Sequence, residues 1–148
     1  MEPPCAGGPT LRKGMLSLDN KVALVTGAGR GIGRAVAVEF GNQGVRVALA
    51  ARTRADLEET ARSVKGAEIL PTDIRDSEEV ERLVRAAVRK LGPIDILVNA
   101  AGVSHYGPVA EASDEDYDSV LDTNLRGIFF VCRSVLPGMI ERKHGHII

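Results

Sequence analysis

The feature that most constrains the fold is a glycine-rich segment, residues 22–34, with the sequence VALVTGAGRGIGR. Its first four residues, Val22–Val25, are apolar and have the length of a buried parallel strand. Ile32, Val36 and Phe40 then recur at helical spacing. A strand that enters a helix through glycines leaves backbone N–H groups free at the helix N-terminus, and small residues let a pyrophosphate approach. We therefore expect a nucleotide-binding loop here.

The spacing of the glycines narrows the type of loop. Thr26, Gly27, Gly31 and Gly33 form the pattern T-G-x-x-x-G-x-G, which differs from the G-x-G-x-x-G fingerprint of many dinucleotide-binding proteins. A P-loop would need a glycine, four residues and then Gly-Lys-Ser/Thr, and the chain contains no such run. For the glycine pattern by itself, an ordinary strand-to-helix turn that binds no ligand is the alternative.

Apolar runs of strand length alternate with helical patterns along the rest of the chain. The further predicted strands lie at residues 45–50, 67–70, 94–98 and 145–148. Strands that alternate with helices form a parallel sheet with right-handed crossovers. We therefore predict an α/β fold, a Rossmann-type doubly wound parallel sheet with helices on both faces, cut off at the start of the fifth strand.

The helices are predicted from candidate caps and from apolar periodicity. An N-cap residue is followed three positions later by an acidic residue in three pairs: Thr53 and Asp56, Asp76 and Glu79, and Ser113 and Asp116. The last pair begins a helical region that continues to about Arg142, with a bend expected at Pro137. The side of this region predicted to be buried comprises Leu121, Leu125, Ile128, Cys132, Val135 and Met139.

Composition excludes several classes of protein. The chain has 148 residues, 44% of them hydrophobic, and a net charge of −1, which supplies no basic field for nucleic acid. No apolar run has the length of a membrane span. Residues 1–18 hold three prolines and no secretory signal, so we predict a flexible extension followed by a domain at residues 19–148. Two cysteines are too few for a disulfide scaffold, and we expect a cytoplasmic protein.

Arginines stand where an NAD-binding fold usually has an acid. About 20 positions past the glycines, an acidic residue normally binds the ribose hydroxyls of NAD. This chain instead has Ala51 followed by Arg52, with Arg54 two positions further and Arg30 inside the glycine loop. Guanidinium groups suit a 2′-phosphate, so the pattern predicts NADP(H) in preference to NAD. Solvated loop arginines are the alternative.

Two more candidate motifs follow predicted strands, at the edge where ligands bind to open α/β sheets. Asp73 and Ile74 follow the third strand, where the carboxylate can accept a hydrogen bond from an adenine amino group, although a turn aspartate is the alternative. Small residues after the fourth strand let the backbone pass under a flat ligand, and the asparagine can tie neighbouring loops together. This motif consists of Asn99, Ala100, Ala101 and Gly102.

Asn124 lies within a helical pattern among apolar residues, where asparagine is a poor helix former. Either it bonds locally and kinks the helix, or it serves a site. Together with Asn124, the motifs above resemble those of the short-chain dehydrogenase/reductase family, in order and separation, from about Lys21 to Ile148. The segment TGAGRGIG is similar to 3-oxoacyl-(acyl-carrier-protein) reductases. The resemblance implies a seven-stranded sheet, NAD(P)(H)-dependent chemistry on a carbonyl or secondary alcohol, and a homodimer or homotetramer.

The resemblance also implies which residues act. The cofactor would be bound by Thr26, Gly27, Arg30, Gly31, Ile32, Gly33, Arg52, Asp73, Ile74, Asn99, Ala100, Ala101 and Gly102. The family's catalytic group is Asn-Ser-Tyr-Lys, of which only Asn124 carries over. Its helix break would hold a water that links the lysine to solvent.

The tyrosine and lysine of that group occur as Tyr-x-x-x-Lys in the family. Here Tyr106 and Tyr117 are followed four positions later by Ala110 and Leu121, so both are expected to be surface or packing residues. We predict an N-terminal part of an NADP(H)-dependent oxidoreductase that is inactive by itself. A truncated, non-catalytic nucleotide-binding form and a methyl-donor-binding Rossmann domain are the alternatives. His144-x-His146 has no carboxylate or cysteine partner within reach by sequence, so no metal site is predicted.

Overall fold

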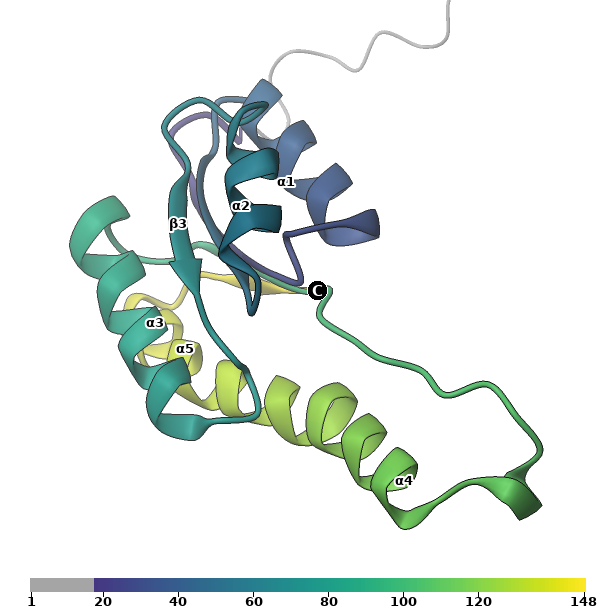
Figure 1. Ribbon diagram of the computed structural model, residues 1–148. Coiled ribbons are helices and arrows are strands. Elements are labelled where there is room, and N and C mark those ends of the chain that lie inside the picture. The colour runs from purple at the N-terminus through teal and green to yellow at the C-terminus, as the bar shows by residue number, and fades with distance from the viewer. Residues whose placement is uncertain (1–17) are drawn as a thin grey trace, which may run out of the picture.

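The computed structural model describes residues 18–148, so the predicted extension lies outside the described residues except for Leu18 (Figure 1). The strands are β1 (Val22–Thr26), β2 (Arg46–Ala51), β3 (Glu68–Pro71), β4 (Ile96–Asn99) and β5 (His146–Ile147). The helices are α1 (Gly31–Asn42), α2 (Arg54–Ala61), α3 (Ser77–Leu91), α4 (Asp114–Leu121) and α5 (Ile128–Arg142). A short 3-10 helix, η1 (Val109–Glu111), precedes α4, and a π-helical segment, η2 (Asp122–Gly127), joins α4 to α5.

The strands form one parallel sheet in the order β3-β2-β1-β4-β5. β1 lies in the centre, paired with β2 on one side and β4 on the other. All five of its residues are buried, as expected for a strand covered on both faces. The chain runs outward from β1 in both directions, which makes the β1–β4 boundary a topological switch point, where open α/β sheets bind ligands. The predicted fold class is confirmed, with strand limits shifted by one or two residues.

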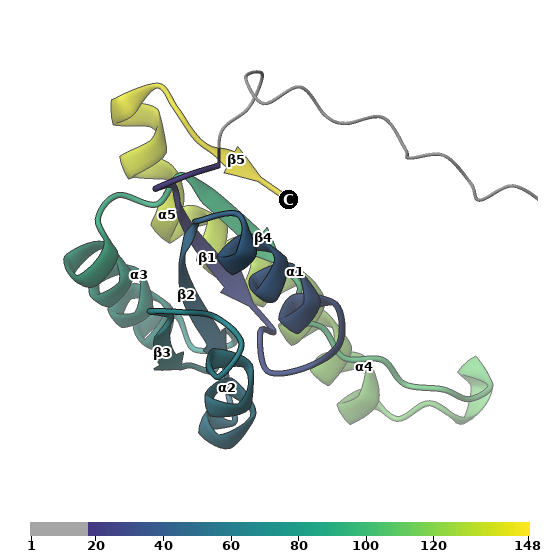
Figure 2. The ribbon, with the colours of Figure 1, turned by 90° about the horizontal axis from the view of Figure 1, so that it is seen from above.

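Helices cover both faces of the sheet, as Figure 2 shows from above. Along β1 the side chains alternate between the two cores: Val22 and Leu24 pack with α3 and α5, whereas Ala23 and Val25 pack with α1 and α2. This alternation follows from the two-residue period of a strand. The two layers hold the strand ends in place, and the loops at the carboxyl ends of the strands form the site described below.

The predicted helix caps are confirmed in part. The carboxylate of Asp76 accepts hydrogen bonds from the N–H groups of Glu78 and Glu79 at the start of α3. Ser113 and the residue three positions on form the predicted reciprocal capping box of α4. Thr53 occupies the N-cap position of α2, but its side chain makes no capping hydrogen bond, so that part of the prediction is wrong. Thr53 instead lies on the lining of the cleft described below.

The apolar spacing of Ile32, Val36 and Phe40 does not mark the buried side of α1. Ile32 is 78% exposed, and the buried positions are Gly33 and Ala37. The reason is steric: a Cβ atom on Gly33 would lie 2.3 Å from the carbonyl oxygen of Gly27, so this side of the helix packs directly on the glycine loop. Ile32, one position earlier, consequently faces the cleft.

In the first half of the long helical region, the side that is buried differs from the side that was predicted. Val135 and Met139 are buried as expected, but Leu121 and Leu125 are 37% and 65% exposed. The buried positions recur at every fourth residue: Thr123, Gly127, Val131, Val135 and Met139. The π-helical segment η2 inserts extra backbone into the turn, which shifts the buried face before α5 begins. α5 then continues through Pro137 to Arg142.

Candidate functional site

A cleft of about 360 Å³ lies at the carboxyl ends of the parallel strands, within the size range of small-molecule sites. It is lined by the loops that follow β1, β2, β3 and β4, together with η2. The predicted residues on its lining are Gly27, Arg30, Gly31, Ile32, Arg52, Asp73, Ile74, Ala100, Ala101 and Gly102. Those absent from the lining are Thr26, Gly33, Asn99 and Asn124. Predictions from widely separated motifs therefore meet in one place.

The glycine loop presents an uncapped helix start to this cleft. Arg30 is the N-cap residue of α1, and it makes no side-chain capping bond. The first turn holds no acidic residue, and the first helical hydrogen bond runs from the Arg34 N–H to the Arg30 carbonyl (3.3 Å). The N–H groups of residues 31–33 come before Arg34 in the chain, so they have no hydrogen-bond acceptor within the helix. An anion placed there would receive these donors and the positive end of the helix dipole.

Gly31 shows that the loop has room for a ligand. Its φ of +55° lies in the left-handed region that favours glycine. A Cβ added at this position would have no atom of the described residues within 4 Å, apart from its chain neighbours and the nearby backbone of its own helix. The backbone is therefore open toward the cleft, in contrast to the tight packing at Gly33.

Thr26 and Asn99 do not line the cleft, but their hydrogen bonds join the strand ends that carry its loops. The buried hydroxyl of Thr26 donates to the Val98 carbonyl (3.3 Å) and accepts from the Ala101 N–H (3.2 Å). Asn99 uses its backbone N–H and its side-chain amide to contact the Ile148 carbonyl, at 2.8 and 3.4 Å. The two residues tie the end of β4 to β1 and β5, which is the tying role predicted for the asparagine.

Asp73 lies on the cleft lining, and a neighbouring arginine holds its carboxylate in the charged form. Arg75 donates to both carboxylate oxygens, from Nε to Oδ1 at 3.0 Å and from Nη2 to Oδ2 at 2.6 Å. This hydrogen bonding holds the pKa of the Asp73 carboxyl below its ordinary value, so at neutral pH the group only accepts hydrogen bonds. The Asp73 N–H donates to Glu79 Oε2 at 2.8 Å. Asp76, not Asp73, caps α3, but Asp73 Oδ1 also accepts a hydrogen bond from the Arg75 backbone N–H at 3.0 Å. Asp73 is therefore a turn aspartate as well as a residue of the cleft lining.

Two guanidiniums and one carboxylate line the cleft between the glycine loop and the segment after β2. Arg30 and Arg52 line the cleft, whereas Arg54 lies on α2 with Glu58 at 3.7 Å and does not. Asp56 also lines the cleft, close to the glycine loop. Sequence reasoning assigned Asp56 to a helix cap and missed this position. The signal that the sequence offered was the position of Asp56 in the first turn of the helix that follows β2.

Asn124 joins η2 to the loop after β4. Its side-chain amide donates to the Val103 carbonyl (2.8 Å) and accepts from the Val103 N–H (2.9 Å). The side chain therefore does not bond locally, although it lies in a distorted helical segment, and it instead joins that segment to a residue of the cleft lining. Thr123 and Val103 line the cleft beside it and were missed. The only signal in the sequence was the polar pair at positions 123 and 124 within an apolar helical pattern.

The remaining candidates lie away from this site. Tyr106 and Tyr117 are 91% and 63% exposed, as expected for surface residues. His144 Nε2 lies 3.8 Å from Oδ1 of Asp95, a carboxylate far from it in the sequence that the fold brings near. Within residues 18–148, no three histidine, cysteine or acidic side chains are grouped to hold a metal. In the same range no helix is both long and apolar enough to cross a membrane.

Comparisons with known proteins give a consistent result. A family model described as short chain dehydrogenase matches residues 21–148. The chain is 35% identical over 136 residues to an uncharacterized oxidoreductase of Staphylococcus aureus, covering 90% of this chain and 59% of that protein. It is 39% identical over 150 residues to the glycine betaine reductase of Emericella nidulans, covering 95% of this chain and 12% of that protein. The chain thus spans less than two thirds of these curated relatives.

Two solved structures share the fold. One is a protein from Sinorhizobium meliloti described as a short-chain alcohol dehydrogenase, with a TM-score of 0.83, 37% identity, and coverage of 89% of this chain and 55% of that chain. The other is a variant of actinorhodin polyketide ketoreductase determined with NADPH. Its TM-score is 0.81 and its identity 42%, and the match covers 90% of this chain and 53% of the other.

Proposed function

The chain belongs to the short-chain dehydrogenase family, and we propose that it is the NADP(H)-binding part of an oxidoreductase acting on a carbonyl or a secondary alcohol. The observation that carries this proposal is the uncapped start of α1, which faces a cleft that also holds two guanidiniums. A helix start of this kind suits a diphosphate, and guanidiniums suit a 2′-phosphate. The ketoreductase neighbour determined with NADPH supports the choice of cofactor.

Each wall of the cleft has a proposed role. The N–H groups at the start of α1 would bind the diphosphate, with Gly31 leaving the approach open. Arg30 and Arg52 would bind the 2′-phosphate. The ionised carboxylate of Asp73 would accept a hydrogen bond from the adenine amino group, beside the backbone of Ile74.

The chemistry proposed for the whole protein is hydride transfer, which bound NADPH supplies from its nicotinamide ring. The residues of this chain bind and orient: Ala100, Ala101 and Gly102 provide a small-residue wall, and Asn124 holds it against η2 through Val103. We propose that the serine, tyrosine and lysine of the family lie outside these 148 residues. The similarity to 3-oxoacyl-(acyl-carrier-protein) reductases remains a prediction and does not identify the substrate.

A homo-oligomer is part of the proposal. Leu125, Phe129 and Ile140 are 65%, 55% and 69% exposed along η2 and α5. Large apolar side chains exposed together on one helical region typically mark an interaction surface. A dimer or tetramer assembled through this region would cover them.

The proposal is tested by cofactor binding to the full-length protein. Titration calorimetry should show tighter binding of NADPH than of NADH. Replacing Arg52 by Ala together with Ala51 by Asp should shift this preference toward NADH by about ten- to a hundredfold, because a charge-assisted phosphate contact is lost. Arg54→Ala is the matched control and should leave the preference unchanged, since Arg54 pairs with Glu58 outside the cleft. Failure of the full-length protein to bind NADPH would reject the proposed function.

Activity separates the two forms of the protein. The 148-residue chain should show no turnover of a ketone panel with NADPH, whereas the full-length protein should reduce at least one ketone. Turnover by the 148 residues would show that the catalytic groups lie within them. Cofactor binding without turnover by the full-length protein would favour a non-catalytic nucleotide-binding form.

A further inference from the structure

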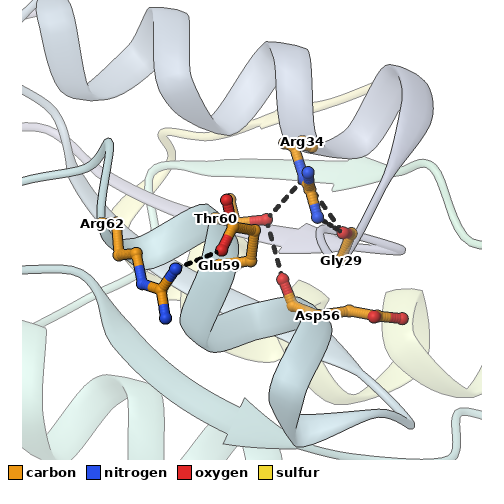
Figure 3. A network of polar contacts seen from close by, with 6 residues as sticks. All are labelled: Gly29, Arg34, Asp56, Glu59, Thr60 and Arg62. Atoms are coloured by element: carbon orange, nitrogen blue, oxygen red, sulfur yellow. Dashed lines mark hydrogen bonds and ion pairs between the residues drawn. The ribbon is translucent and has the colours of Figure 1, made fainter.

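We propose that Arg34 and Thr60 are positioning residues that hold the glycine loop in the shape that binds a diphosphate. The inference rests on the proposed function and deepens it, because it assigns part of the cofactor affinity to two side chains outside the cleft lining. Figure 3 shows the contact between them: Arg34 reaches from α1 to the Gly29 carbonyl and to the hydroxyl of Thr60, which belongs to α2.

The side chain of Arg34 contacts the backbone of the glycine loop. Its Nε donates to the Gly29 carbonyl and to Thr60 Oγ1, both at 3.0 Å, and its Nη2 donates to the same carbonyl. In the described part of the chain, no carboxylate forms an ion pair with Arg34. The guanidinium lies one turn from the start of α1, where its charge adds to the field that attracts an anion, whereas the carboxylate of Asp56, close to the same loop, opposes it.

Thr60 extends the contact to the preceding carbonyl. The residue is 1% exposed, and its hydroxyl lies 2.8 Å from the Ala28 carbonyl oxygen and 3.1 Å from that of Asp56. While it accepts from Arg34, the hydroxyl can donate to the nearer carbonyl, that of Ala28. Two consecutive carbonyls of the glycine loop, those of Ala28 and Gly29, are therefore bound from the side of α1 and α2.

The direction of these carbonyls determines the direction of the adjacent N–H groups. In a trans peptide the C=O and the following N–H point in opposite directions. Because the carbonyls of Ala28 and Gly29 point toward Arg34 and Thr60, the N–H groups of Gly29 and Arg30 point the other way. Gly29 and Arg30 both line the cleft. The pair therefore keeps acceptors out of the anion site and donors available to it.

The test compares cofactor affinity with stability in the full-length protein. Thr60→Val preserves the side-chain volume and removes the hydroxyl. We expect the Kd values for NADPH and NADH to rise together, by about tenfold, with kcat at saturating cofactor unchanged. Thr60→Ser retains a hydroxyl and should restore both affinities. Arg30→Ala should weaken NADPH more than NADH, which distinguishes the loop from the 2′-phosphate contact.

Arg34 provides the second arm and Arg62 the control. Arg34→Met should weaken both cofactors at least as much as Thr60→Val, and Arg34→Lys should recover part of the loss because it keeps a charge and a donor. Arg62 also belongs to the α2 region in Figure 3, but its guanidinium pairs with exposed Glu59 at 2.6 Å. Arg62→Ala should leave both Kd values unchanged.

The outcomes separate the two proposals. If Thr60→Val and Arg34→Met lower Tm while both cofactors bind with wild-type affinity, the pair is only structural and the inference fails, although the proposed function stands. If Thr60→Val does not fold, the Arg34→Met and Arg34→Lys variants decide in its place. If the wild-type protein does not bind NADPH, the proposed function fails, and the inference fails with it.

Discussion

The starts of α1 and α3 differ in how their backbone N–H groups are satisfied. Both helices follow strands of the same parallel sheet and begin at its carboxyl edge. At α3, Asp76 accepts two backbone N–H groups, and Glu78 and Glu79 complement the helix dipole in the first turn. At α1, the N-cap is Arg30, which makes no capping bond, and the first turn has no acid. A helix start completed by its own sequence is structural, whereas one left open is a place for an anion.

The two starts also differ in what supports them. The loop before α3 is held by its own neighbours, because Asp73 contacts Arg75 and Glu79 within six positions. The loop before α1 is held by Arg34 and by Thr60, a residue of another helix. The start of α1, which we propose binds an anion, thus depends on a residue of another helix as well as on Arg34 of α1, whereas the start of α3 depends on local sequence.

The largest expected effect comes from making α1 resemble α3. Arg30→Asp would place a capping carboxylate at the α1 N-cap and remove a guanidinium from the cleft. We expect NADPH affinity of the full-length protein to fall roughly 100-fold or more, since a charge-assisted contact is replaced by repulsion. Stability should be unchanged or higher because the new side chain can cap the helix. Calorimetric titration measures the affinity, and wild-type affinity in this variant would remove α1 from the site.

Opening α3 should have a smaller effect of a different kind. Asp76→Ala removes the cap and should lower the free energy of unfolding by about 1 kcal/mol, as typical N-cap substitutions do. NADPH affinity should stay at the wild-type value because this helix start binds its own side chain. Urea unfolding and calorimetry measure the two quantities, with Asp76→Ser as the control that retains a cap. A loss of cofactor affinity equal to that of Arg30→Asp would contradict the distinction between the two starts.

The smallest effect concerns the pH dependence of the loop before α3. The hydrogen bond from Arg75 lowers the pKa of Asp73 below 3.8, so the ionised pair stabilises the folded state above that pH and loses its effect as the pH falls through the lowered value. Arg75→Ala should therefore reduce the free energy of unfolding at pH 6, by less than about 1 kcal/mol because the pair is partly exposed. The difference from the wild type should vanish in acid. Urea unfolding at several pH values tests this, and a difference that persists well below pH 3 would contradict it.

Much of the fold followed from the sequence because its signals are local. The apolar runs located the five strands along the chain, and the Asp76 and Ser113 caps identified two helix starts. The errors arose where packing between distant elements overrides periodicity. Leu121 and Leu125 have the spacing of the residues expected to be buried in the long helical region, but the π-helical turn changes which side is buried.

For the candidate site, the sequence by itself determined the strand–glycine–helix unit, the arginines near it and the polar residues at the strand ends. These features depend only on the spacing of residues along the chain, so the sequence is enough to locate them. Only the tertiary structure decided that Asp56, Val103 and Thr123 join the cleft and that Thr60 supports the glycine loop. Their positions depend on how loops and helices far apart in the chain close over one edge of the sheet, and residue spacing carries no direct record of that closure.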